Sequence, residues 1–139
     1  MKKFLVGLIA ALMVAAGFVA FSGTAANAKA CPYGGCLPTY TFIDAPNKVV
    51  KNHRARICVR VGSQGNGAPK GKVTIRVVRS TGGYRFIDTK SYEGGNKCFT
   101  TTKLRKLGDY SVKAIFDRKP GSRWQDSDNF DEFQVVRHR

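Results

Sequence analysis

Apolar and polar residues alternate along the segment 107–116, which reads LGDYSVKAIF. Tyr110, Val112, Ala114 and Phe116 occupy every second position, so in an extended chain they point to one face. This period of two predicts a β-strand with one face buried and the other in solvent.

Seven short segments of this kind follow one another, separated by turns rich in Gly, Pro, Asn and Ser. They are residues 39–44, 54–61, 72–79, 84–90, 97–104, 109–117 and 130–137. Their content of Val, Ile, Thr and aromatic residues predicts an all-β, two-sheet sandwich in one domain, residues 39–139. Residues 29–38 hold two Cys, two Pro and two Gly and are predicted to form an irregular tail.

Three motifs stand out within these strands. The first is a Pro-x-Gly-x-Val-x-Ile strand that begins at Pro69, and the second is Leu-Gly-x-Tyr-x-Val-x-Ala-x-Phe from Leu107. The third is Trp124 followed by Ser127 before the last strand. Together they resemble the bacterial immunoglobulin-like domains, group 3 type, that occur as repeats in secreted and surface proteins, over roughly residues 40–137. The resemblance implies an immunoglobulin-like sandwich and no specific chemistry.

Residues 1–28 are typical of a secretory signal peptide. Two lysines precede an uncharged, Ala-rich run over 4–21, and Ala-x-Ala sequences end at Ala28 and Ala30. Both are small-residue cleavage sites, so we expect a secreted protein with no membrane span after cleavage. Two alternatives stay open: an uncleaved anchor helix, and a lipoprotein processed before Cys31.

All four cysteines lie in the exported part of the chain, which predicts two disulfides. Cys58 and Cys98 both fall on the face of their strands opposite to the apolar residues. An immunoglobulin-like order places those two strands side by side in one sheet. Because both cysteines point outward from strands that this order makes neighbours, we expect a Cys58–Cys98 bridge on the outer face of the sheet. Cys31–Cys36 would then be the second disulfide.

Catalytic and metal-binding patterns are weak. His53 precedes a strand, His138 is the penultimate residue, and neither has a matching nucleophile or zinc-ligand spacing. The acidic run 126–132 is predicted to be a solvated loop; it departs from an EF-hand, and a loop calcium site is the minor alternative. We therefore expect no catalytic residue, cofactor or metal, and Trp124 is predicted to pack over the core.

Basic residues give the chain its strongest functional signal. Twenty-four Lys and Arg against nine Asp and Glu give +15 at pH 7, and loss of the two signal lysines leaves +13. Such a charge attracts anionic surfaces, and it equally serves solubility in an anionic envelope. Six cations are expected on the outer faces of the two sheets: Arg54, Arg56, Arg60, Lys72, Arg76 and Lys113.

These observations favour a secreted, non-catalytic domain with a binding or structural role at the bacterial cell envelope. Its partner would be an anionic envelope polymer or a protein, held by diffuse attraction. Nucleic acid is not expected, because the aromatics Tyr84 and Phe86 share a phase that favours the core. The alternative is a secreted inhibitor or antimicrobial effector that acts on a protein or membrane through the loop from Cys31 to Cys36.

Overall fold

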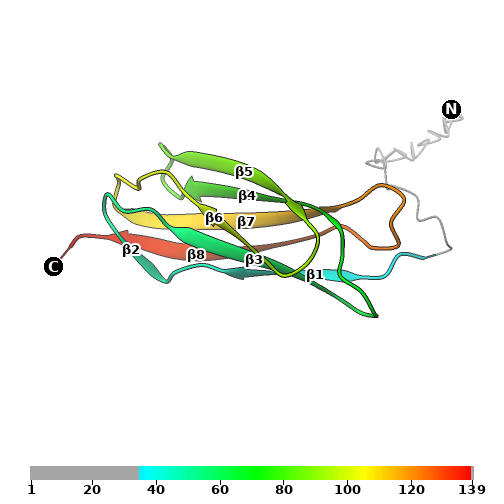
Figure 1. The fold of residues 1–139 in the computed structure, drawn as a ribbon. Coiled ribbons are helices and arrows are strands. Elements are labelled where there is room, and N and C mark those ends of the chain that lie inside the picture. The colour runs from blue at the N-terminus through cyan, green and yellow to red at the C-terminus, as the bar shows by residue number, and fades with distance from the viewer. Residues whose placement is uncertain (1–34, 139) are drawn as a thin grey trace, which may run out of the picture.

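Two β-sheets face each other in the computed structural model, which describes residues 35–138 (Figure 1). The three-stranded sheet has the order β1-β3-β6, and the five-stranded sheet has the order β2-β8-β7-β4-β5, with β2 parallel to β8. The strands are β1 (Thr39–Asp44), β2 (Lys48–Val50), β3 (Arg56–Ser63), β4 (Gly71–Arg79), β5 (Arg85–Tyr92), β6 (Asn96–Thr100), β7 (Gly108–Arg118) and β8 (Ser127–Val136). The predicted all-β, immunoglobulin-like sandwich is confirmed.

The core lies between the sheets and is built from alternate residues of each strand. Its members on β3 and β7, the central strands of the two sheets, are Ile57, Val59, Val61, Tyr110, Val112, Ala114 and Phe116. Burial of a side chain of this size contributes roughly 1.5–3 kcal/mol, so these two strands supply a large part of the stability. The strand phases read from the sequence are confirmed for both.

Side-chain bonds join the sheets along the edge formed by β5 and β6. Tyr92 of β5 is buried, and its hydroxyl accepts a bond from the Val61 amide at 2.9 Å and donates to the Gly95 carbonyl at 2.8 Å. Lys90 donates from β5 to the Cys98 carbonyl of β6 at 2.7 Å. The sandwich is therefore closed by polar contacts where the backbone ladder is interrupted.

The opposite edge is closed in the same way between β1 and β8. Thr39 donates its hydroxyl to the Gln125 carbonyl at 2.8 Å, and the Thr41 and Ser127 hydroxyls lie 2.8 Å apart. Asn129 donates its side-chain amide to the Thr41 carbonyl at 3.0 Å. These bonds satisfy polar groups of two threonines that are nearly excluded from solvent.

Several strand boundaries differ from the prediction. A short additional strand, β2, pairs with β8. The predicted strand over 97–104 ends at Thr100, so residues 101–107 form the connection to β7. The strand predicted to begin at 54 begins at Arg56, which places Arg54 outside the sheet. Beyond Thr100, backbone bonds to the 52–55 segment replace the strand ladder, as from the Leu104 amide to the His53 carbonyl at 2.9 Å.

The acidic run 126–132 is mainly a strand, because β8 begins at Ser127, and the prediction of a loop was wrong. Asp128 and Glu132 lie on the solvated face of β8 with Phe130, where Asp128 is 2.7 Å from the Lys113 ammonium, whereas Asp131 has the phase of the buried Phe133. Asp126, just before the strand, accepts a bond from the Arg118 amide at 2.7 Å. Asp128 and Asp126 thus pair with a neighbouring cation and a neighbouring amide.

The predicted Cys58–Cys98 bridge is present and links β3 to β6 at directly opposed positions, with Cα atoms 4.0 Å apart. Cys36 also takes part in a disulfide, and Cys31, its predicted partner, lies outside the described residues, as do the signal peptide and the tail before Gly35. Within residues 35–138, no helix is long and apolar enough to span a membrane.

Candidate functional site

The six predicted cations are exposed, but the fold divides them among three surfaces. Arg56 and Arg60 lie on the outer face of the small sheet, and Arg54 lies at one end of the sandwich. Lys72, Arg76 and Lys113 lie on the outer face of the large sheet, where Arg76 is directly opposite Lys113. Five of the six therefore lie on the outer faces of the two sheets, as the strand phase predicts, and Arg54 does not, because its strand begins at Arg56.

The outer face of the small sheet combines cations with aromatic rings. Tyr40 and Phe42 of β1 are 46% and 47% exposed, and the Arg60 guanidinium lies 5.2 Å from the centre of the Phe42 ring. Arg56 is beside the disulfide, 3.6 Å from the Cys98 sulfur. The Arg56 and Arg60 side chains on this face therefore already have partners in the protein.

The outer face of the large sheet carries charge of both signs. Lys113 is paired with Asp128 at 2.7 Å, and Glu132 lies on the same strand face near the exposed ring of Phe130. Lys72 and Arg76 extend from β4 beside them. The net attraction of this face for an anion is reduced because carboxylates lie among its cations.

A hollow of about 500 Å³ opens at the end of the sandwich that carries the 80–84 turn and the 101–107 connection. Four of its lining residues are cationic, and within the described chain none of the lining residues is acidic. The lining consists of Arg54, Gly83, Tyr84, Thr102, Lys103, Arg105, Lys106 and Tyr110. This is the strongest concentration of positive charge around any concave surface between residues 35 and 138 that we identified.

The 101–107 connection is anchored to the core through Leu104, which is fully buried. The Leu104 amide donates to the His53 carbonyl at 2.9 Å, and the Leu104 carbonyl accepts a bond from the Asn52 amide at 2.7 Å. These two backbone bonds bring Arg54 next to Lys103, although the residues are far apart in sequence.

Two further groups hold the same connection from the side of the large sheet. The buried Tyr110 hydroxyl donates to the Lys106 carbonyl at 2.8 Å. Arg79 donates to the Leu107 carbonyl at 3.0 Å and to the Gly82 carbonyl at 3.3 Å, so it joins the connection to the 80–84 turn. Burial raises the pKa of Tyr110 above its ordinary value of 10.0, and nearby Arg79 partly opposes that shift.

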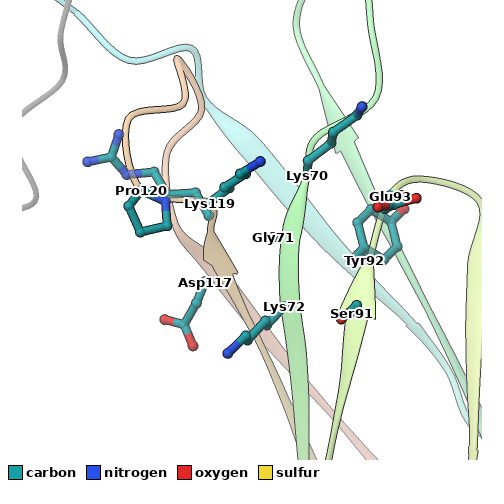
Figure 2. Close-up of a pocket in the computed structure, with 10 residues that line it drawn as sticks. Lys70, Gly71, Lys72, Ser91, Tyr92, Glu93, Asp117, Lys119 and Pro120 are labelled. Carbon is teal, nitrogen blue, oxygen red and sulfur yellow. The ribbon is translucent and has the colours of Figure 1, made fainter.

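A second hollow, of about 610 Å³, lies where β4, β5 and β7 meet at the other end (Figure 2). Lys70, Lys72 and Lys119 surround it, but the carboxylates of Glu93 and Asp117 lie among them (Figure 2). The mixed charge makes this hollow less suited to an anion than the end hollow that Arg54 lines.

Trp124 is buried, with 5% of its surface exposed. The Arg123 guanidinium covers its ring at 4.7 Å from the centre. Leu37 lies alongside this segment. Its amide donates to the Arg123 carbonyl at 2.7 Å, and its carbonyl accepts a bond from the Gln125 amide at 2.9 Å. Trp124 therefore packs as predicted and offers no open ring face for a ligand, and the tail at Leu37 is held in place.

The histidines lie apart from these surfaces. His53 is exposed, with Nδ1 3.2 Å from the Lys51 carbonyl, and His138 is exposed near the end of the chain. No group of three or more His, Cys, Asp or Glu residues suited to a metal occurs within the part of the chain that the structure describes.

Sequence reasoning did not single out Lys103, Arg105 and Lys106. The signal is the run Lys-Leu-Arg-Lys, in which three cations surround one apolar residue. An isolated apolar residue within a charged run suggests a loop pinned to the core with its charges pointing outward. That signal locates the cations at the surface and does not reveal their proximity to Arg54.

No family model matches the chain, and no curated protein matches it significantly. Among solved structures, it is similar to the CARDB domain of a Pyrococcus furiosus protein solved in complex with di-metal ions. The two chains are 18% identical, the match covers 74% of this chain and 90% of that one, and the TM-score is 0.42.

Proposed function

We propose that this protein is a secreted, non-catalytic immunoglobulin-like domain, of the bacterial group 3 type, that binds anionic polymer at the cell envelope. The observation that carries the proposal is the scarcity of ion pairs. Residues 35–138 form two, Lys113–Asp128 and Arg118–Asp126, although they hold 20 of the 24 Lys and Arg of the chain. Most of the positive charge is therefore available to an external polyanion.

The distribution of that charge favours many weak contacts. Exposed cations lie on both outer faces and at both ends of the sandwich. Each contact with a polyanion is screened over about 8 Å at physiological salt, so the total attraction is a sum of short-range contributions. A polymer is the natural partner, because it can reach several of these surfaces at once.

Secretion is part of the same proposal. The predicted signal over 1–28 supports export, and disulfides are typical of oxidising compartments. The Cys58–Cys98 bridge is compatible with that location.

The test is retention of the mature domain on immobilised anionic polymer, with heparin and poly-glutamate as the probes. Because the attraction is distributed, elution should be graded between low and moderate salt. The Arg54→Gln, Arg56→Gln, Arg60→Gln variant should elute at lower salt and still bind, since Lys72 and Arg76 remain. Unfolding curves of both proteins provide the control for folding.

The proposal would be overturned by a wild-type domain that passes through both columns at low salt. It would also be overturned by a single salt-insensitive site that disappears in a folded Trp124→Ala protein.

A further inference from the structure

We propose that the end hollow around Arg54 is a discrete binding site for a tetrahedral oxyanion, a phosphate or sulfate group carried on a larger molecule. The proposal rests on the proposed function in taking the ligand to be part of a polyanion. The polyanion would then be held at one defined site, through a phosphate or sulfate group, in addition to the distributed attraction.

The first argument is that the cations of the hollow lack partners. Within residues 35–138, Arg54, Lys103, Arg105 and Lys106 form no ion pair, and their side chains donate no hydrogen bond. Four like charges around one hollow of about 500 Å³ repel one another. An anion bound among them would relieve this repulsion and use donors that the protein leaves free.

The second argument is that the backbone is fixed before any ligand arrives. Leu104 holds the centre of the connection in the core, while Tyr110 and Arg79 hold its end through the carbonyls of Lys106 and Leu107. Binding then requires ordering of side chains and not of a loop. A smaller ordering cost leaves more of the electrostatic attraction as affinity.

The hollow also contains a hydroxyl pair and an opening for an ammonium group. The Tyr84 and Thr102 hydroxyls lie 2.9 Å apart, so one of the two O–H groups is left to donate to a ligand oxygen. At Gly83, an added Cβ would lie 2.7 Å from the Lys106 nitrogen. Glycine at this position, where φ is +76°, therefore leaves the space that the ammonium occupies.

These donors suit a tetrahedral oxyanion better than a carboxylate. Two guanidinium groups, two ammonium groups and a hydroxyl offer more donors and more charge than one carboxylate, with two oxygens, can use. Arginine binds phosphate oxygens through its planar fork, and lysine adds a point charge. The hollow also exceeds the size of a single such group, which leaves room for the unit that carries it.

Titration calorimetry at 0.15 M salt with inorganic tripolyphosphate and with a sulfated heparin tetrasaccharide tests this site. The first ligand represents phosphate and the second sulfate, so the tighter of the two identifies the source. The site variant is Lys103→Gln, Arg105→Gln, Lys106→Gln. The matched control is Lys72→Gln, Arg76→Gln, Arg85→Gln, which removes the same charge from the outer face of the large sheet.

We expect about tenfold weaker binding of the tighter ligand for the site variant, and less than about threefold for the control. A second variant, Thr102→Asp, places a carboxylate among the four cations. It should weaken binding comparably while the domain stays at least as stable, because the carboxylate relieves their repulsion. Its control is Thr89→Asp, which makes the same charge change about 17 Å from Tyr84 along β5.

Equal weakening by the site variant and its control overturns the discrete site and leaves the distributed attraction standing. Absence of binding for both ligands in the wild type overturns the site as well. Site-specific binding in a domain that no polymer column retains overturns the proposed function and supports the site.

Discussion

Gly71 of β4 lies against the backbone of β7 with no room for a side chain. A Cβ at this position would lie 2.1 Å from the Asp117 carbonyl oxygen and 2.9 Å from the Arg118 Cα. Both obstacles are backbone atoms of a central strand, and they cannot rotate away. The glycine in the Pro-x-Gly-x-Val motif is therefore required by space in the paired strands.

Replacement of Gly71 by Ala should destabilise the domain by ~1–3 kcal/mol, the range for an overpacked site. Gly62→Ala is the matched control on β3, because its Cβ would come closest to the Phe42 ring, at 3.2 Å. That ring is half exposed and can swing, so the control should change stability by at most about 0.5 kcal/mol. Urea unfolding measures both, and equal costs would contradict the packing argument.

Tyr110 links the core to the end hollow. Its ring is fully buried between Tyr84 and Phe133, each with a ring centre 5.4 Å away, and its hydroxyl donates to the Lys106 carbonyl. Because burial raises its pKa above 10.0, the folded protein holds this proton more tightly than the unfolded chain does. The stability that follows is complete below pH 10 and is lost as pH rises through the folded pKa.

Thermal unfolding between about pH 8 and pH 11 tests this linkage. The wild type should lose stability more steeply above about pH 10 than Tyr110→Phe, which has no hydroxyl to ionise. At neutral pH the variant should be about 1 kcal/mol less stable, because the Lys106 carbonyl loses its partner. The control Tyr40→Phe, at an exposed tyrosine, should lose stability above about pH 10 as steeply as the wild type does. Parallel curves for the wild type and Tyr110→Phe would show that Tyr110 does not cause the loss.

At the scale of elements, β6 is the least secured strand of the small sheet. It has five residues, pairs with β3 on one side, and lies at the edge of its sheet. The Cys58–Cys98 bridge joins β6 to β3 outside the core and closes a sequence separation of 40 residues. The bridge therefore stabilises an element that has few other contacts.

Removal of both cysteines by Cys58→Ala and Cys98→Ala should reduce the free energy of unfolding by about 2–4 kcal/mol. The protein should still fold, because the apolar core between the sheets is intact. Hydrogen exchange should rise more at residues 96–100 than in β7, whereas Thr100→Ala, also on β6, should leave exchange nearly unchanged. Uniform acceleration across both sheets would show that the bridge supports the entire sandwich.

At the scale of the whole molecule, the two ends of the sandwich differ in charge. The end hollow around Arg54 is lined by cations without carboxylates, whereas the hollow in Figure 2 mixes lysines with Glu93 and Asp117. A polyanion is therefore attracted from all sides but finds its most positive contact at one end. The graded release by salt tests the distributed attraction, and the loss of oxyanion binding in the site variant tests the end hollow.

The sequence by itself determined the architecture where periodicity is strong. Period-two alternation placed the core residues of β3 and β7 and turned Cys58 and Cys98 outward, and the immunoglobulin-like resemblance made their strands neighbours. These features follow from local geometry, since alternate residues of a strand must point to opposite faces. The predicted exposure of Arg56, Arg60, Lys72, Arg76 and Lys113, which lie in strands, follows from the same rule.

Only the tertiary structure decided the remaining features. β2 has three residues, too few for a period, and it exists because β8 offers it a parallel partner. The run 126–132 resembles a loop in composition because both faces of β8 are polar there: Ser127 and Asn129 bond to Thr41 of β1, and Asp128 faces solvent. The end hollow depends on two backbone bonds of Leu104 that join residues 52–53 to the 101–107 connection. Such long-range contacts leave no local pattern, so the cations could be counted from the sequence but their convergence required the fold.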